Sequence, residues 1–272
     1  MKKFPVNKET DLKSFISEVL GLTKNKAKEI IDSKNVFVNS KRVWIASHTL
    51  KKGDIVEIAD IDNSFSWKPE KSVIYEDQFI LAVQKPPFLE SEGRKGSVEY
   101  QLRKVLDRRL KAIHRLDRET SGVLLFAKNE KIFHRFKDLW HRKEVVKVYL
   151  SISYGEAKFK KKVVNMPVDK KYAKSIFFTK KISKGFTLFE VEIKTGRKHQ
   201  IRIHSSKIRH PIVGDKIYGL KKVEDPLTKN VKRQMLHGYR LRFLHPFTGK
   251  VVDIKAPVYH DFYNFGKLVK LL

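Results

Sequence analysis

Cysteine and long hydrophobic runs are both missing from this chain of 272 residues. The absence of cysteine excludes disulfide bonds, thiolate chemistry and zinc sites with cysteine ligands, and it fits a reducing compartment. The longest apolar runs, such as 79–83 and 123–127, are far shorter than the ~20 residues that a membrane-spanning helix needs. Residues 1–7 include lysines but no apolar core follows them, so no signal peptide is expected. We therefore expect a soluble, cytoplasmic protein.

Acidic residues are scarce relative to basic ones. Asp and Glu number 30 against 59 Lys and Arg, which gives a formal net charge of +29 at pH 7. A folded protein this basic is typical of nucleic-acid binding, and its affinity for a polyanion should fall steeply with added salt. A generally basic proteome or selection for solubility would give the same excess, so charge alone leaves that alternative open. The length permits one large domain or two.

Residues 1–60 have the pattern of a small module with two helices and two strands. Gly21 suits the end of the first helix and Thr23 the N-cap of the second. Strands are expected at 36–38 and 55–58, with a turn at 53–54 before the last one. Three lysines are expected to crowd the exposed side of the second helix and to contact RNA: Lys24, Lys26 and Lys28.

This module resembles an S4 RNA-binding domain. The matching segments are 22–27, 30–31, 36–39 and 52–58. Lys34 and Ser40 stand where that family usually has glycines, one before the first strand and one after Asn39. Asn35 and Asn39 tolerate a positive φ better than most residues, so the turns can still form. A small basic α/β module of another type is the alternative.

The remaining chain divides into a linker and a larger domain. Periodicity is lost over residues 61–71, which predicts a linker, and the second domain is expected at 72–272. Strands are expected at 73–75, 79–83, 123–126, 145–152, 186–193, 201–204, 240–243 and 251–254. Helices are expected at 98–110, 131–140 and within 205–208. Many strands without a regular βαβ rhythm predict an α+β fold with a mostly antiparallel sheet.

The segment 114–122, His-Arg-Leu-Asp-Arg-Glu-Thr-Ser-Gly, concentrates the chemistry of the chain. It places Asp117 between Arg115 and Arg118, just before an apolar strand. A carboxylate among cations is held ionised, and an ionised carboxylate can act as a nucleophile or a base. Taken alone, a structural salt bridge to either arginine explains the motif equally well.

With this motif in view, the chain resembles the RluA-type family of pseudouridine synthases. The matching segments are 73–77, 83–86, 114–122, 147–149, 195–204, 210–215, 218–219, 236–237, 240–241, 245–246 and 248–250. An S4 module ahead of the catalytic domain is common among the ribosomal-RNA enzymes of this family. The resemblance implies isomerisation of uridine to pseudouridine in RNA, in which an N–C bond breaks and a C–C bond forms. Such a reaction needs no metal and no organic cofactor.

The resemblance also assigns roles to single residues. Asp117 matches the catalytic aspartate, and Tyr149 matches the active-site tyrosine, whose ring can stack on the detached uracil. Arg202 matches the arginine that pairs with the aspartate and holds it in place. If residues 200–204 form a strand, alternation places Arg202 on its polar face. Taken alone, Tyr149 would be a core residue and Arg202 a surface arginine.

A target base in folded RNA must be extruded before a side chain can reach it. Arg115 is a candidate to fill the vacated gap, and Arg197 and Lys198 are expected to contact RNA. Glu90 and Glu92 depart from the family's pattern and bring negative charge near the presumed RNA path.

Lys85, in a Lys-Pro motif, is expected to be structural or to contact phosphate. The basic run 158–162 fits a solvated hairpin tip as well as a phosphate contact.

Several functions remain open at this point. Large-subunit ribosomal RNA is the favoured substrate because of the S4-like module, and transfer RNA is the rival within the same class. A catalytically silent RNA-binding or ribosome-assembly protein is a second reading. Its weakness is that Asp117, Tyr149 and Arg202 are all intact. A glycoside hydrolase would need two cooperating carboxylates, which the motifs do not supply. We expect a monomer.

Overall fold

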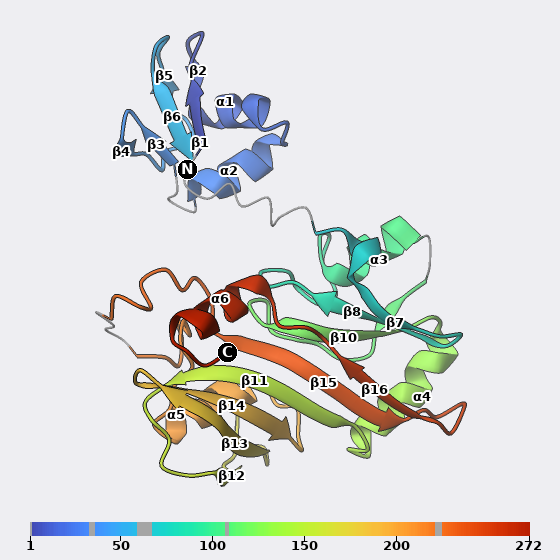
Figure 1. The fold of residues 1–272 in the computed structure, drawn as a ribbon. Coiled ribbons are helices and arrows are strands. Elements are labelled where there is room, and N and C mark those ends of the chain that lie inside the picture. The colour runs from blue at the N-terminus through green and yellow to red at the C-terminus, as the bar shows by residue number, and fades with distance from the viewer. Residues whose placement is uncertain (1, 33–35, 59–66, 107–108, 221–224) are drawn as a thin grey trace. The chain divides into compact units, whose positions relative to one another are not determined.

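The computed structural model describes residues 2–32, 36–58, 67–106, 109–220 and 225–272 (Figure 1). The chain forms two compact units, Met1–Ser66 and Trp67–Leu272, and each is described by itself. The second unit begins inside the predicted linker. Trp67 packs against a hydrophobic cluster of this unit, and a short 3₁₀ helix, η2 (Pro69–Ser72), follows it. Residues 61–66 of the predicted linker lie outside the described residues.

The first unit combines two helices with a four-stranded sheet in the order β1-β6-β3-β4, and with a two-stranded sheet of β2 and β5. Its elements are β1 (Lys2–Pro5), β2 (Thr10–Asp11), α1 (Leu12–Val19), α2 (Lys24–Asp32), β3 (Val36–Val38), β4 (Lys41–Arg42), β5 (Thr49–Leu50) and β6 (Ile55–Ile58). One hydrophobic core joins the helices to the strands. The two helices and the strands at 36–38 and 55–58 were predicted.

Local chemistry explains the bends of this unit. Gly21, with φ of 60°, ends α1, and the amide of Leu22 donates to the carbonyl of Ser17 at 2.9 Å. Asn39 and Ser40 both adopt positive φ, at 49° and 64°, and Ser40 stands where the S4 family usually has a glycine. The Asn39 side chain accepts from the Ile55 amide and so fastens this turn to β6. The other two positions of that comparison, 34 and 35, lie outside the described residues.

The second unit is built on a ten-stranded sheet, mixed but mostly antiparallel. Its main order is β12-β13-β14-β11-β15-β10-β8-β7, with β16 paired to β15 and β9 to β10. The strands are β7 (Val73–Glu76), β8 (Ile80–Lys85), β9 (Lys111–Ala112), β10 (Ser121–Ala127), β11 (Val146–Tyr154), β12 (Lys161–Asn165), β13 (Lys174–Ser183), β14 (Phe186–Ile193), β15 (Leu236–Leu244) and β16 (Val251–Lys255). Only β10 and β15 pair in parallel among the described strands.

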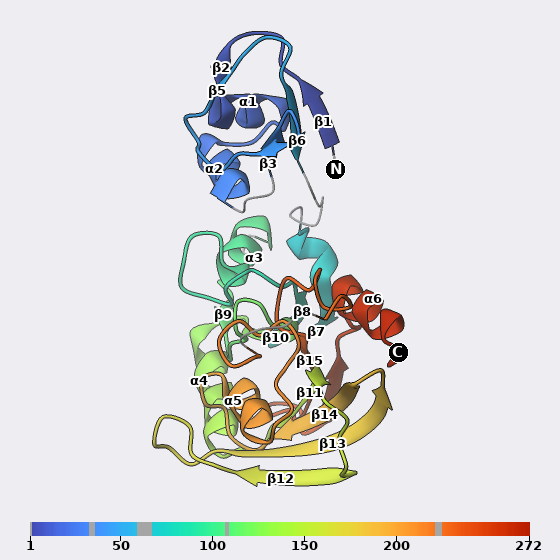
Figure 2. The ribbon, with the colours of Figure 1, turned by 90° about the vertical axis from the view of Figure 1, so that its left-hand side faces the viewer.

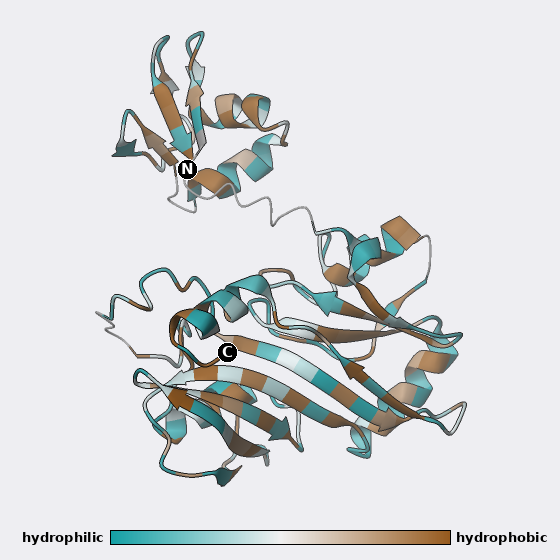
Figure 3. Ribbon diagram, viewed as in Figure 1, coloured by the Kyte–Doolittle hydropathy of each residue, from teal (hydrophilic) through white to brown (hydrophobic). Residues whose placement is uncertain are grey.

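Helices cover both faces of this sheet. They are α3 (Val98–Leu106), α4 (Glu130–His141), α5 (Gln200–Lys207) and α6 (His260–Leu268). Figure 2 shows α4 and α5 on one side of the sheet and α6 on the other. Hydropathy alternates along the central strands in Figure 3, as expected for strands whose two faces meet different surroundings. The predicted α+β architecture is therefore confirmed for this unit.

Two predicted elements are corrected. The strand predicted at 201–204 is the start of helix α5, and its residues do not alternate across a sheet. The side chains of Gln200 and His204, one helical turn apart, both hydrogen-bond the hydroxyl of Ser175 on β13 at 2.9 Å. These long-range bonds override the local strand-like pattern. The helix predicted at 98–110 is observed over Val98–Leu106, and Arg109 and Leu110 are not helical. Residues 107–108 of this prediction lie outside the described residues.

Candidate active site

Asp117 lies in the wall of a cavity of about 880 Å³ in the second unit. The lining residues are 90–94, 99, 111, 115–119, 198–199, 202, 216–217 and 234. Seven of them are Lys or Arg and five are Asp or Glu, so the cavity carries both signs with an excess of positive charge. The fold thus gathers Asp117, Arg115, Lys198 and Arg202 around one space.

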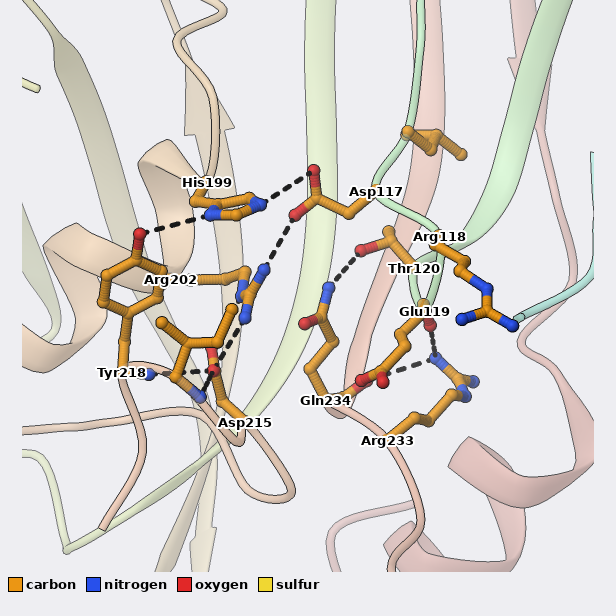
Figure 4. A network of polar contacts seen from close by, with 12 residues as sticks. Asp117, Arg118, Glu119, Thr120, His199, Arg202, Asp215, Tyr218, Arg233 and Gln234 are labelled. Carbon is orange, nitrogen blue, oxygen red and sulfur yellow. Dashed lines mark hydrogen bonds and ion pairs between the residues drawn. The ribbon is translucent and has the colours of Figure 1, made fainter. Parts of the chain in front are cut away.

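Arg202, on α5, holds two carboxylates at once (Figure 4). Its Nη1 donates to Oδ2 of Asp117 over 3.3 Å. Its Nε and Nη2 donate to the two carboxylate oxygens of Asp215 at 2.7 and 2.8 Å. Two parallel charge-assisted bonds fix the plane of a guanidinium, so Asp215 aims the remaining edge of Arg202 at Asp117.

Both carboxylate oxygens of Asp215 accept hydrogen bonds. Its Oδ1 also accepts from the backbone amides of Ile217 and Tyr218, at 2.9 and 3.0 Å. Burial would raise the pKa of the Asp215 carboxyl, but the bonds from Arg202 and from these two amides hold it below its usual value. Burial acts on Arg202 in the opposite direction, and the neighbouring carboxylates overcome it, so the pKa of the guanidinium is raised. Both groups stay ionised.

His199 is the second residue that contacts the carboxylate of Asp117. Its Nε2 lies 3.9 Å from Oδ1 of Asp117, and its Nδ1 lies 3.2 Å from the hydroxyl of Tyr218. Burial lowers the pKa of His199, although the charge of Asp117 opposes this shift. The imidazole is therefore mainly neutral at neutral pH. His199 takes a φ of 55°, a conformation that non-glycine residues rarely adopt, immediately before α5 begins.

The loop that carries Asp117 is fastened to distant segments. Ser91 Oγ accepts from the amide of Leu116 and donates to its carbonyl, at 2.9 and 3.0 Å. Arg233, which is fully buried, donates to the carbonyl of Glu119 at 3.0 Å. Gln234 donates to the hydroxyl of Thr120 at 2.7 Å. These contacts hold the loop on both sides of Asp117.

The sequence of this chain is similar to those of known proteins. The sequence model described as RNA pseudouridylate synthase matches residues 79–207. Ribosomal large subunit pseudouridine synthase C of Buchnera aphidicola is 31% identical over 92% of this chain and 90% of its own length. The synthase C of Vibrio vulnificus is 33% identical over 84% of this chain and 82% of its own.

The chain belongs to the RNA pseudouridine synthase family. The family predicted from its motifs is thereby confirmed, and the protein is an enzyme of that class. The fold agrees: the structure of human RNA pseudouridylate synthase domain containing 4 matches with a TM-score of 0.64 at 21% identity. That match covers 74% of this chain and 94% of the human one.

Tyr149 stands beside the cavity of this synthase, and it is not among the residues that line it. It lies on β11, half-buried, in the register position opposite Gly238 of β15. Burial, and then the negative charge of Asp117, raise the pKa of the Tyr149 hydroxyl well above its usual value. The phenol therefore stays protonated and can donate a hydrogen bond.

Lys85 is buried and cannot contact phosphate. Its ammonium donates to the carbonyls of Pro86 and Arg118, at 2.7 and 3.1 Å. Burial lowers its pKa, and the positive charge of Arg233 adds to this shift. Of the two roles expected for Lys85, the contacts support the structural one, because its ammonium binds the backbone of the loop that carries Asp117.

The predicted RNA contacts are solvent-accessible. Arg115 is exposed at the cavity, and Lys198, also exposed, lines it. Arg197 is exposed as well, and its Nε donates to the carbonyl of Tyr172. In the first unit, Lys24 and Lys28 are exposed and Lys26 pairs with Glu29 at 3.1 Å.

The two glutamates that depart from the family pattern both line the cavity. Glu90 lies 3.6 Å from Arg94, an ion pair that offsets its charge in part, and Glu92 is exposed. Both glutamates thus bring negative charge to the cavity lining, and their position relative to the RNA stays a prediction.

Several residues of the site were missed at the level of sequence. Asp215 and His199 both fall inside matched motifs, but nothing local to them indicates that they meet Arg202 and Asp117.

Within the described residues, no group of three or more histidine, aspartate and glutamate side chains is arranged to hold a metal ion. None of the described helices is long and apolar enough to cross a membrane.

Proposed function

We propose that the protein isomerises uridine to pseudouridine in structured RNA, with Asp117 as the catalytic carboxylate. The observation that most supports this proposal is the way in which Arg202 and Asp215 hold Asp117 in place. Arg202 reaches Asp117 at 3.3 Å while Asp215 fixes the guanidinium, all at the edge of a cavity with exposed cations. A carboxylate positioned in this way is ready to act without rearranging.

Each residue near Asp117 has a proposed task. Asp117 attacks the sugar, attacks the base, or removes a sugar proton, and each of these steps uses the ionised form. Tyr149, kept protonated, offers its ring to the detached uracil and its hydroxyl to the C5 proton. Arg202 orients the carboxylate. Arg115, exposed at the cavity, fills the space that the extruded uridine leaves in the RNA.

Large-subunit ribosomal RNA is the proposed substrate. The relatives from Buchnera aphidicola and Vibrio vulnificus are both named ribosomal large subunit pseudouridine synthase C. We also propose that the first unit is an S4-type RNA-binding domain. The capped helix α2, with Lys24 and Lys28 exposed, supports this assignment. The cytoplasm is the proposed site of action.

The variant Asp117→Asn tests the catalytic proposal. It keeps the size of the side chain but removes its charge, so pseudouridine formation in ribosomal RNA should be abolished while RNA binding persists. Asp253→Asn, in an exposed pair with Arg240 on β15 and β16, is the matched control and should remain active. Full activity of Asp117→Asn would remove the proposed mechanism.

Mapping pseudouridine in cells with and without the gene tests the substrate. The proposal expects specific sites in large-subunit ribosomal RNA to disappear with the gene. Loss of sites in transfer RNA instead would show that transfer RNA, and not ribosomal RNA, is the substrate. No lost site in either RNA would favour a silent RNA-binding protein.

A further inference from the structure

An exposed aromatic side chain stands among cations near the cavity. Tyr172, in the loop between β12 and β13, is 57% exposed, although the next residue, Ala173, is completely buried. The surrounding cations come from three separate segments. We use the name rim platform for Tyr172 together with Lys143, Lys170, Lys171 and Arg197.

The backbone holds Tyr172 in place. Residues 168 and 171 exchange two hydrogen bonds, at 2.9 and 3.0 Å, across a two-residue turn. The turn residues Asp169 and Lys170 have φ of 50° and 59°, the conformation of a tight hairpin turn. On the other side, Arg197 Nε donates to the Tyr172 carbonyl at 3.1 Å. An aromatic ring on such a fixed backbone loses little freedom when a ligand stacks on it.

Lys143 completes the platform from the end of α4. Its ammonium lies 5.9 Å from the centre of the Tyr172 ring. Lys143 has φ of 61°, and the amides of Lys143 and Glu144 donate to the carbonyls of Trp140 and Leu139. That is the helix-ending position which glycine strongly prefers. A lysine there costs stability relative to glycine, and its side chain reaches the Tyr172 ring.

The charge of the platform is open to a ligand. Lys143, Lys170, Lys171 and Arg197 are all exposed. None of the four forms an ion pair with a carboxylate in the part of the chain that the structure describes. The neighbour of Arg197 in the chain, Lys198, lines the cavity that holds Asp117, so the platform adjoins the site.

We propose that the rim platform binds an unpaired nucleotide of the RNA substrate that lies outside the catalytic cavity. Its base stacks on Tyr172, and its phosphates lie near Lys143 and Arg197. Aromatic rings flanked by Lys or Arg are how proteins bind single-stranded nucleic acid. The ammonium of Lys143 faces the ring, and three further exposed cations lie in the adjoining segments, which favours RNA over a protein partner. This inference rests on the proposed function.

The variants Tyr172→Ala and Tyr172→Phe test the stacking. The RNA is a ribosomal fragment that the wild-type protein modifies. Loss of the ring should weaken RNA binding roughly tenfold or more, and Phe should restore it, because stacking needs only the ring. Affinity should change more than activity at saturating RNA, because the proposed stacking holds a nucleotide that is not the reacting one. Tyr263→Ala is the matched control: Tyr263 is also exposed with a lysine, Lys267, over its ring.

This control lies far from the platform. Tyr263 is on α6, which Figure 2 shows on the opposite side of the sheet from α4 and α5. Wild-type affinity of Tyr172→Ala, or an equal loss for Tyr263→Ala, would overturn the proposal. Heparin, a polyanion without bases, provides a second readout. Tyr172→Ala should bind heparin like the wild type, and a loss as large as that for RNA would also overturn it.

The variant Lys143→Gly tests the cation without endangering the fold. Glycine suits the backbone at this position, so the variant should be at least as stable as the wild type. Its RNA affinity should fall, and the slope of log affinity against log salt should decrease by about one. An unchanged affinity and slope would remove Lys143 from the platform.

An abasic substitution scan along the fragment identifies the nucleotide. At one position, loss of the base should weaken binding to the wild type but not to Tyr172→Ala. Absence of such a position contradicts the stacking. The proposed function fails separately, if the wild type forms no pseudouridine or if Asp117→Asn stays active.

Discussion

Replacing Asp215 by asparagine should weaken the site without touching the substrate. Asp215 is almost completely buried, with a side chain 1% exposed, and its two oxygens accept from Arg202 at 2.7 and 2.8 Å. Asparagine keeps the shape and one oxygen, which can still accept from the amides of Ile217 and Tyr218. Its NH₂ group cannot accept from Nε of the guanidinium, so that bond is lost, and the bond from Nη2 now ends on a neutral oxygen. Asp117 is then the only carboxylate that still contacts the buried arginine among the described residues.

The cost follows from this geometry. Removing one partner of a buried ion pair destabilises a protein by about 3–5 kcal/mol, because the remaining charge stays buried. For a unit of this size, each kcal/mol lowers the melting temperature by ~2–4 °C, so a decrease on the order of 10 °C is expected. Arg202 also loses its fixed plane, so the 3.3 Å contact with Asp117 becomes irregular. We expect the turnover number to fall at least roughly tenfold with little change in RNA affinity.

Two assays check these expectations, thermal unfolding and single-turnover pseudouridine formation at saturating RNA. Asp253→Asn is the control, because Asp253 also binds an arginine, Arg240, through both oxygens but at the surface. An exposed pair contributes about 0–1 kcal/mol, so this variant should melt within a few degrees of the wild type. If Asp215→Asn equals the control in stability and turnover, the clamp on Arg202 has no role.

Two further predictions concern the strands below the loop. Gly122→Ala should prevent folding or cost several kcal/mol, because a methyl there would lie 2.2 Å from the carbonyl oxygen of Gly238 on β15. Gly238→Ala, whose methyl would lie 3.4 Å from Leu116 Cδ2, should be much milder, and equal denaturant stability of the two variants would contradict this reasoning. Burial lowers the pKa of His237 to about 4 from an ordinary 6.5, so the folded protein keeps it neutral. As pH falls below 6.5, the unfolded state takes up a proton at His237 that the folded state does not. The free energy of unfolding therefore decreases by about 2 kcal/mol between pH 7 and pH 5, and His237→Gln should flatten this pH dependence.

The parts of the fold that could be predicted are those with a strong local pattern. Strand β14 was predicted with its observed bounds, and β10 within a few residues, because apolar residues dominate both. Strand β13 was missed because its second half is rich in lysine, and pairing with β14 is what makes it a strand. Helix α5 was misread because five residues of alternating polarity fit a strand as well as a helix. Bonds to distant residues, such as those to Ser175, are what favour the helix.

The candidate site shows the same division. Asp117 and Arg202 are 85 residues apart, and the family resemblance correctly predicted that they meet. The contribution of Asp215 could not be predicted, because its role depends on a guanidinium that the fold brings to it. The platform at Tyr172 was missed for a similar reason. Lys143 and Arg197 reach this tyrosine from distant segments, and an isolated tyrosine in a polar loop carries no signal.

Hydrogen bonds from distant segments hold the loop that carries Asp117, and helix α6 takes part in this. Loops are usually more mobile than the elements they connect, while a reacting carboxylate needs a fixed position. Arg233 resolves this conflict by binding the carbonyl of Glu119 on one side and both oxygens of Asp261, on α6, on the other. Helix α6 lies across the sheet from α5, yet it helps to fix the segment that carries Asp117. Changes at Asp261 should therefore alter turnover through the position of Asp117, although α6 does not line the cavity.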